Sequence, residues 1–161
     1  MAFRQALGRF ATGVTLVTTI DREGRPIAVT VNSFSSVSLE PPLVLFSLAR
    51  AATRFADFEA AGRFAINVLT AEQQELSDRF ARSGQDLLDG VPHRLGAHGC
   101  PLIEGALATF ECRTEARHDG GDHDIFVGAV DAIANTEADG PLLYYCGRYR
   151  VVAASDTDEP S

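Results

Sequence analysis

The feature that most constrains the fold is a succession of short β-type segments separated by turn residues. Val14–Ile20 alternates β-branched residues and is followed by a turn over Asp21–Arg25, after which Pro26–Asn32 resumes the strand pattern. These three segments predict a β-hairpin. Further strands are predicted over Val37–Leu39, Leu43–Leu48, Arg63–Leu69, Ala106–Ala116, Ile125–Ala134 and Leu142–Val152. Short antiparallel strands with few helices favour a mainly β domain that closes into a barrel.

Apolar residues at helical spacing predict three helices between these strands. They are a short helix with Phe3, Leu7 and Phe10 on one face, a helix over Arg50–Ala61 that stops at Gly62, and a helix from the capping box Thr70–Gln73 to about Arg82. Ser83–Gly105 is rich in Gly and Pro and is predicted to be a long loop. Loops of that length in compact domains are often functional, so this one is a candidate cover for a ligand site.

The length of 161 residues fits a single domain. No repeat, linker or low-complexity block divides residues 1–153, so we expect one barrel domain there and a disordered acidic tail over 154–161. Apolar residues make up 45% of the chain and charged residues 22%, a globular composition that supports a packed core.

The charge of the chain is unevenly distributed. All 14 basic side chains are arginine, against 22 acidic ones, for a net charge of −8. Residues 1–70 carry seven Arg and five acidic residues, so the acidic surplus lies in residues 71–161. The overall acidity argues against a nucleic-acid binder, which usually has a basic face. The absence of lysine excludes Schiff-base chemistry and a P-loop lysine, so a bound phosphate would depend on arginine, hydroxyl and backbone N–H groups.

The cysteines and the N-terminus favour a cytoplasmic protein. Cys100, Cys112 and Cys146 lie at wide spacings among apolar or small neighbours, and no CxxC pair occurs. They are expected to be buried free thiols. The first ten residues do not resemble a secretory signal, and no apolar run is long enough to span a membrane, so no membrane partner is expected.

Two polar segments have the groups for a ligand site. Thr30–Ser38 places five hydroxyls and an amide in nine residues, which could hydrogen-bond a flat heteroaromatic ring, although an ordinary edge strand has the same composition. Ser47–Arg50, followed by Thr53 and Arg54 at the predicted start of a helix, has the groups for an anionic phosphate. The alternative there is a capped helix with solvent-facing arginines.

Two further positions carry weaker signals. Arg79 and Phe80, at the end of the third predicted helix, could add a cation and an apolar wall, or could be surface charge and core. His123 lies between two aspartates in the turn Gly120–Asp124. The histidines and cysteines lack the spacing of a zinc site, so no metal is expected. No nucleophile elbow and no GxGxxG fingerprint after a strand is present.

In combination, these segments resemble the short-chain flavin reductase family, the NAD(P)H:flavin oxidoreductases that serve as small components of two-component flavin-dependent monooxygenases. The matching stretches occur in order through residues 3–152 and are Phe10–Thr19, Thr30–Leu39 with Pro41–Leu43, Gly62–Leu69, Arg79–Ala81, Gly105–Leu107, Gly121–His123 and Pro141–Tyr145. Asp124 departs from the family pattern, in which a hydroxyl or apolar residue commonly follows the histidine, and so do Cys146 and Gly147 after the tyrosine pair.

The resemblance implies a split β-barrel of the Greek-key, FMN-binding type, normally a homodimer. It implies hydride transfer from NADH or NADPH to FMN or FAD, and delivery of the reduced flavin to a partner monooxygenase. It also implies that His123 places the nicotinamide, with Tyr144 and Tyr145 nearby. The positions that correspond to flavin contacts are Thr30, Val31, Asn32 and Ser33 at the ring, Ser47, Leu48, Ala49, Thr53 and Arg54 toward the phosphate, and Arg79 and Phe80 as a second wall.

Two alternatives to a flavin reductase remain open. One is a split-barrel flavoprotein that keeps its flavin bound and acts as an oxidase or a sensor. The other is a non-enzymatic, acidic, dimeric binding module in which Thr30–Ser38 is only an edge strand. The reductase is favoured because hydride transfer between two stacked rings needs orientation and no protein nucleophile.

Overall fold

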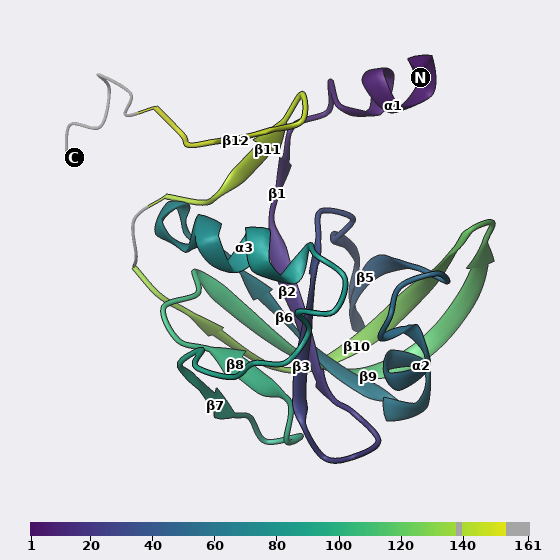
Figure 1. Ribbon diagram of the computed structural model, residues 1–161. Coiled ribbons are helices and arrows are strands. Elements are labelled where there is room, and N and C mark those ends of the chain that lie inside the picture. Colours follow the sequence, from purple (N-terminus) through teal and green to yellow (C-terminus); the bar gives the residue numbers. More distant parts are fainter. Residues whose placement is uncertain (138–139, 154–161) are drawn as a thin grey trace.

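A computed structural model describes residues 1–137 and 140–153 and shows a mainly β protein (Figure 1). The strands are β1 (Thr12–Gly13), β2 (Thr15–Ile20), β3 (Pro26–Val31), β4 (Ser35–Leu39), β5 (Pro42–Ala49), β6 (Arg63–Val68), β7 (His93–Leu95), β8 (Pro101–Ile103), β9 (Ala108–Gly120), β10 (His123–Asn135), β11 (Leu143–Tyr145) and β12 (Arg148–Arg150). The helices are α1 (Ala2–Leu7), α2 (Phe55–Ala61), the 3₁₀ turn η1 (Ala71–Gln73) and α3 (Gln74–Phe80). The predicted acidic tail over 154–161 lies outside the described residues.

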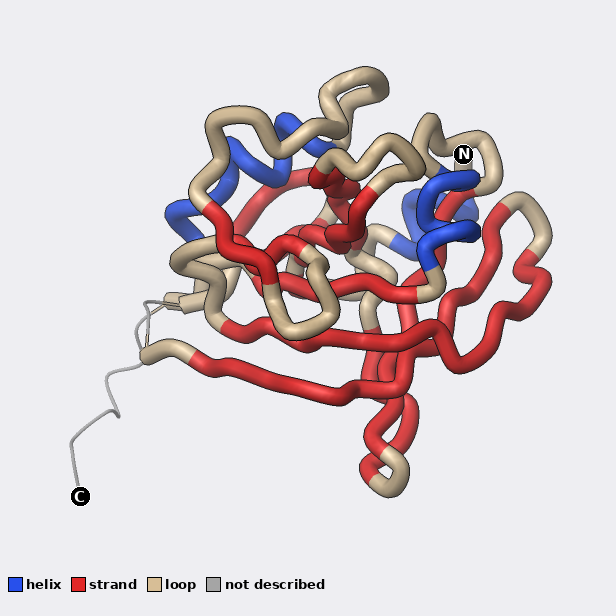
Figure 2. Tube along the Cα trace, turned by 90° about the horizontal axis from the view of Figure 1, so that it is seen from below, coloured by secondary structure: helices blue, strands red, loops and turns tan. Residues whose placement is uncertain are grey.

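Seven strands form one antiparallel sheet in the order β3-β2-β6-β9-β10-β5-β4. The predicted hairpin is confirmed, since Thr15 of β2 pairs with Val31 of β3 and Ile20 pairs with Pro26. The sheet curves until β3, at one end of the strand order, approaches β5, the next-to-last strand at the other end. In Figure 2 the strands wrap around the interior and the helices lie at the periphery. The predicted fold, a mainly β split barrel, is confirmed.

The barrel interior is filled by phenylalanine rings from three strands. Phe46 of β5 stacks on Phe126 of β10 with 5.0 Å between ring centroids, and meets Phe64 of β6 edge to face at 4.9 Å. Each ring buried in this way contributes ~1.5–3 kcal/mol of hydrophobic stabilisation. The packing requires Gly128, because a Cβ atom there would lie 2.5 Å from Cζ of Phe64.

A second, smaller sheet lies beside the barrel. The prediction that Leu142–Val152 ends the main sheet is wrong, because β11 pairs with β1, and β12 with β11, in a separate three-stranded sheet. In Figure 1 this sheet and α1 stand above the barrel. The predicted N-terminal helix is present but ends at Leu7, and the side chains of Phe3 and Phe10 are each 77% exposed. Its apolar face is therefore not covered by the described part of this chain.

The predicted loop over Ser83–Gly105 is instead a packed segment with a hairpin of its own. It contains β7 and β8, which pair with each other. Its first part runs along β3, where the N–H of Ala28 donates to the carbonyl of Asp86 at 2.9 Å and Leu87 forms a bridge with Ile27. Leu88 and Val91 are buried in the core. Because this segment supplies core residues and covers the edge of β3, the expectation of a cover over a ligand site is not supported.

Two local predictions have different outcomes. The capping box is confirmed, since the N–H of Thr70 donates to Oε1 of Gln73 at 3.1 Å just before α3. The second helix, however, begins at Phe55 rather than at Arg50. The five residues after β5 form turns, and they bring two arginines into contact with distant parts of the chain, as described below.

The cysteines divide into two classes. Cys100 and Cys112 are buried free thiols, as predicted, and burial raises the pKa of Cys112 to about 12. Cys146 is exposed, so the expectation of three buried thiols is wrong at that position. It lies in the turn between β11 and β12, and a turn of this kind exposes its side chains to solvent. Within the described ranges, none of the helices has the length and apolar character needed to cross a membrane.

Candidate functional site

A groove opens where the chain leaves the main sheet after β3. It lies next to the end of β5 and the turn of the β9–β10 hairpin. Its cavity has a volume of about 440 Å³, within the usual range for a small-molecule site. It brings together most of the predicted ligand residues, which are Thr30, Val31, Asn32, Ser33, Ser47, Leu48, Ala49 and His123. We call this cavity the Asn32 groove.

Two further depressions adjoin the Asn32 groove. One, of about 590 Å³, continues toward Phe10, Thr15 and Phe34. The other, of about 180 Å³, contains Tyr144 together with residues of β3 and α3. Asn32 borders all three cavities, so they meet around this one side chain. The three cavities together offer more room than the Asn32 groove alone.

The wall of the groove is built by the chain immediately after β3. Pairing between β2 and β3 ends at Val31, and among the described residues no main-chain oxygen accepts a hydrogen bond from the N–H groups of Asn32 and Ser33. The Ser33 hydroxyl accepts the N–H of Ser47 at 2.9 Å and donates to the Ser47 carbonyl at 3.0 Å. Ser33 therefore fixes β5 beside this segment, while the two N–H groups are left as donors for a ligand.

Hydroxyls elsewhere in the polar segment also have structural partners. Thr30 donates from Oγ1 to the carbonyl of Ser77 at 2.8 Å, which ties β3 to α3. The hydroxyl of Ser77 in turn lies 2.7 Å from the hydroxyl of Tyr149. Composition alone left open whether these hydroxyls contact a ligand or belong to an ordinary edge strand. The geometry instead gives Ser33 and Thr30 the role of holding the groove in shape.

His123 lies at the rim of the Asn32 groove, at the first position of β10. It pairs with Ala49 of β5 on one side and with Gly120 of β9 on the other. Its Nδ1 atom is 2.6 Å from Oδ1 of Asp122, and this hydrogen bond holds the pKa of Asp122 below its usual range. With Nδ1 bonded to a carboxylate, Nε2 is the nitrogen left for a ligand.

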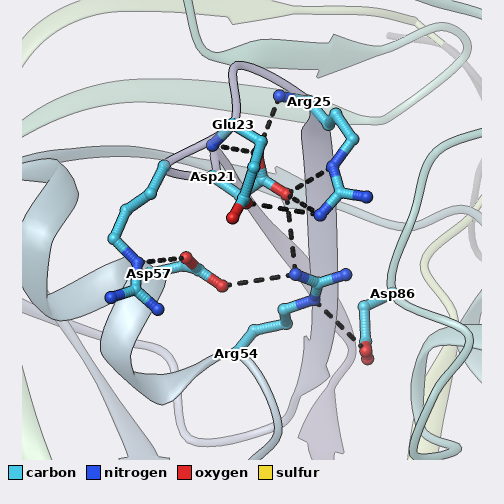
Figure 3. A network of polar contacts seen from close by, with 7 residues as sticks. Asp21, Glu23, Arg25, Arg54, Asp57 and Asp86 are labelled. Atoms are coloured by element: carbon cyan, nitrogen blue, oxygen red, sulfur yellow. Dashed lines mark hydrogen bonds and ion pairs between the residues drawn. The ribbon is translucent and has the colours of Figure 1, made fainter.

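Arg54 does not reach the groove. Its guanidinium is surrounded by Asp21, Asp57 and Asp86, at 3.5, 3.3 and 3.4 Å respectively (Figure 3). We call Arg54 and these three carboxylates the Arg54 network. Arg25 also pairs with Asp21, at 2.8 Å. The predicted phosphate contact of Arg54 would require the guanidinium to leave three carboxylates.

Arg50, the other arginine of the predicted phosphate segment, is also paired with acids. Its Nε donates to Oδ1 of Asp124 at 2.7 Å and its Nη2 donates to Oδ1 of Asp119 at 2.8 Å. The hydrogen bond to Asp124 is the main reason why the pKa of Arg50 is raised. Among the residues described as lining the three cavities there is no arginine. The described site therefore offers a flavin phosphate hydroxyls and N–H groups rather than a free cation.

The remaining predicted residues lie outside the Asn32 groove. Thr53 is exposed in the turn before α2. The guanidinium of Arg79 covers the ring of Phe80 at 4.8 Å and donates to the carbonyl of Leu87 at 2.6 Å, and Phe80 itself is buried in the core. Tyr144 borders the smallest cavity, and Tyr145 of the same strand lies beside Arg9.

Sequence reasoning missed several lining residues. Val29, Ala52 and Ile125 add apolar surface to the Asn32 groove, and Gly120 completes its rim. Small and aliphatic residues carry no functional signal of their own, and only Gly120 was close to a motif. Together they give a groove with apolar walls and a row of hydrogen-bond donors, which fits the flat ring of a flavin with its acceptor-rich edge. In the described part of the chain, no three His, Cys, Asp or Glu side chains converge to hold a metal ion.

Comparison with known proteins identifies the family. The family model for the flavin reductase like domain matches residues 7–153. The chain belongs to this family. It is 50% identical over 148 residues to the FMN reductase (NADH) SmoA of Agrobacterium fabrum, a match that covers 92% of this chain and 83% of that protein. The resemblance inferred from the sequence motifs is thereby confirmed.

Two further relatives of this flavin reductase extend the comparison. The reductase subunit HsaB of a flavin-dependent monooxygenase from Mycobacterium tuberculosis is 40% identical over 157 residues, which cover 96% of this chain and 83% of HsaB. The solved NADH:FAD oxidoreductase SgcE6 of Streptomyces globisporus, in complex with NAD and FAD fragments, is 40% identical with a TM-score of 0.89 and covers 97% of this chain and 93% of its own. Some family members are longer, and the chain spans 47% and 51% of two of them.

Proposed function

We propose that this flavin reductase oxidises NADH and reduces FMN or FAD bound in the Asn32 groove. The observation that carries the proposal is the segment Asn32–Ser33, which lines the groove with His123 at its rim and whose N–H groups donate to no main-chain oxygen of the described residues. NADPH is the less favoured donor, because the carboxylate of Asp122, which is 93% exposed, lies beside His123 and would repel a 2′-phosphate.

The residues of the groove supply binding and orientation. A bound flavin accepts the hydride that the nicotinamide provides, and this chemistry belongs to the two cofactors. The N–H groups of Asn32 and Ser33 would hydrogen-bond the polar edge of the ring, and Ala49 and Ile125 would supply apolar surface beside it. His123 offers Nε2 to the nicotinamide and holds it against the flavin. Alignment of two rings in this way lowers the barrier without a protein nucleophile.

A homodimer is part of the proposal. Phe3 and Phe10, near the N-terminus, are exposed apolar residues. Val151 and Val152, directly after β12 of the small sheet, are also exposed. A second copy of the chain would cover this surface. Size-exclusion chromatography with light scattering should give twice the chain mass, and Phe3→Asp with Phe10→Asp should shift the protein toward the monomer. A monomeric wild-type protein at micromolar concentration would contradict this part.

We further propose that the reduced flavin passes to a partner monooxygenase in the cytoplasm. The Asn32 groove is open to solvent and contains no cation within the described lining, so the flavin should bind weakly enough to leave. A split-barrel flavoprotein with a retained flavin would instead purify yellow, with one flavin per chain. Purification as a colourless protein that binds added FMN reversibly supports the reductase.

The deciding experiment measures NADH and NADPH oxidation with and without added FMN, FAD and riboflavin. Flavin-dependent oxidation of NADH is expected, and its absence with every flavin and both nucleotides would refute the reductase. His123→Ala should raise the KM for NADH about tenfold, the size of effect that loss of one good binding contact produces. His118→Ala is the matched control, because His118 lies on the same hairpin and does not line the groove.

A further inference from the structure

Two carboxylates face each other beneath the turn of the β9–β10 hairpin. Asp119 of β9 and Asp124 of β10 are direct partners in the ladder. Like charges at such positions destabilise a pair of strands. Asp124 is also only 7% exposed, so it needs a cation close by. The turn that these residues flank carries His123.

Arg50 bridges the two carboxylates. Its guanidinium donates to Asp124 at 2.7 Å and to Asp119 at 2.8 Å, so one side chain is bonded to both strands. Its main-chain N–H donates to the carbonyl of Asp122 within the turn, at 3.0 Å. Asp119 in addition accepts the N–H of Gly121 at 3.0 Å. These contacts fix the strands and the turn to the end of β5.

We propose that Arg50 is a positioning residue for the nicotinamide: by clamping the β9–β10 turn it keeps His123 at the rim of the Asn32 groove. Arg50 does not itself line that groove. Ala49, the residue before Arg50, is the strand partner of His123. The contacts of Arg50 therefore lie one residue along β5 from the position opposite His123. The inference rests on the proposed function, in which His123 contacts the nicotinamide.

The hairpin has a second anchor that does not depend on Arg50. Arg117 pairs with Asp124 at 3.4 Å and with Glu59 of α2 at 2.7 Å. These contacts tie the hairpin to α2 below the turn. A protein without the Arg50 side chain should therefore fold, with a turn that is less well fixed.

The test measures two quantities, the KM for NADH and the Kd for FMN. Arg50→Met should raise the KM for NADH about tenfold, as expected when a substrate contact is displaced, and should change the Kd for FMN less than twofold. Arg50→Lys keeps the charge but lacks the fork that bonds both carboxylates, so the increase should be smaller. Arg113→Met is the matched control. It removes a bidentate pair with Asp131 on the same two strands, and should leave the KM unchanged.

The double variant Arg50→Met with His123→Ala separates the two proposals. If Arg50 acts through His123, the double variant should have the KM for NADH of His123→Ala alone. A further increase, multiplied onto that of His123→Ala, would overturn the positioning role and leave the proposed function intact. No effect of His123→Ala on this KM would remove His123 from the nicotinamide site and would overturn both. Should Arg50→Met fail to fold, the same cycle is run with Arg50→Lys.

Discussion

Arg50 and Arg54 lie four residues apart, between β5 and α2, and the sequence predicts the same kind of site for both. Each instead pairs with aspartates from distant parts of the chain. The side chain of Arg50 is 47% exposed and bridges the two strands of a hairpin, whereas that of Arg54 is 18% exposed and is enclosed by three carboxylates. Burial determines how much an ion pair matters for stability. When a cation is removed from a buried site, water cannot compensate the charges of the carboxylates that remain.

The partners of Arg54 come from three separate places. Asp21 opens the turn between β2 and β3, Asp57 lies in α2, and Asp86 belongs to the segment that runs along β3. Arg54 therefore ties α2 to the β2–β3 turn and to the segment that runs along β3. Its Nε has no partner with good hydrogen-bond geometry, although Asp86 is 3.4 Å away. The network is thus held mainly by charge.

The largest effect predicted from this comparison is on stability. Arg54→Met should lower the free energy of unfolding by about 3 kcal/mol, because the buried Asp86 loses its paired arginine, while Asp21 keeps Arg25 and Asp57 keeps Arg22. Urea unfolding followed by circular dichroism measures it. Arg22→Met is the control, since Arg22 is 65% exposed and its pair with Asp57 should contribute at most about 1 kcal/mol. Equal losses in the two variants would show that burial does not distinguish them.

The second prediction concerns flavin phosphate. If Arg54 is held by its network, the ratio of the Kd values for riboflavin and FMN should change less than twofold in Arg54→Met at a temperature where the variant is folded. If Arg54 binds the phosphate, FMN should weaken about tenfold or more while riboflavin does not. Fluorescence quenching titrations of the two flavins decide between these outcomes.

The third prediction is a pH dependence of stability. Burial alone would raise the pKa of Asp21, but hydrogen bonds from Arg25 and Glu23 outweigh it and hold the pKa below its ordinary value. A carboxyl with a depressed pKa in the folded state stabilises the protein fully above its unfolded pKa, about 3.9, and loses this contribution as the pH falls through the folded value. The free energy of unfolding should therefore fall below about pH 4.

A substitution assigns this pH dependence to the network. Asp21→Asn should flatten the acid limb of the stability curve, even though it also lowers stability at neutral pH. Asp119→Asn should flatten it less, because the Asp119 side chain is 77% exposed and its charge is screened by water. An acid limb that is unchanged in Asp21→Asn would contradict the assignment.

The features that could be predicted from the sequence are those that depend on residues close together in the chain. The hairpin of β2 and β3 and the capping box at Thr70 depend on residues close in the chain, and both were predicted correctly. The polar lining of the Asn32 groove was found for the same reason. The roles of Arg50 and Arg54 depend instead on partners that only the fold brings near. Asp119 and Asp124 are 69 and 74 residues from Arg50, so its type and spacing alone left open both a phosphate site and a solvent-facing arginine.

The smallest predicted effect tests the other side of the comparison. Arg50→Met should lower the free energy of unfolding by only about 1 kcal/mol, because its side chain is half exposed and Asp124 keeps Arg117 as a partner. The same variant is expected to have a large effect on the KM for NADH. If it destabilised the protein as much as Arg54→Met, the increase in KM could come from general loosening of the fold. A small loss of stability combined with a large change in KM is therefore the result that separates a positioning residue from a structural one.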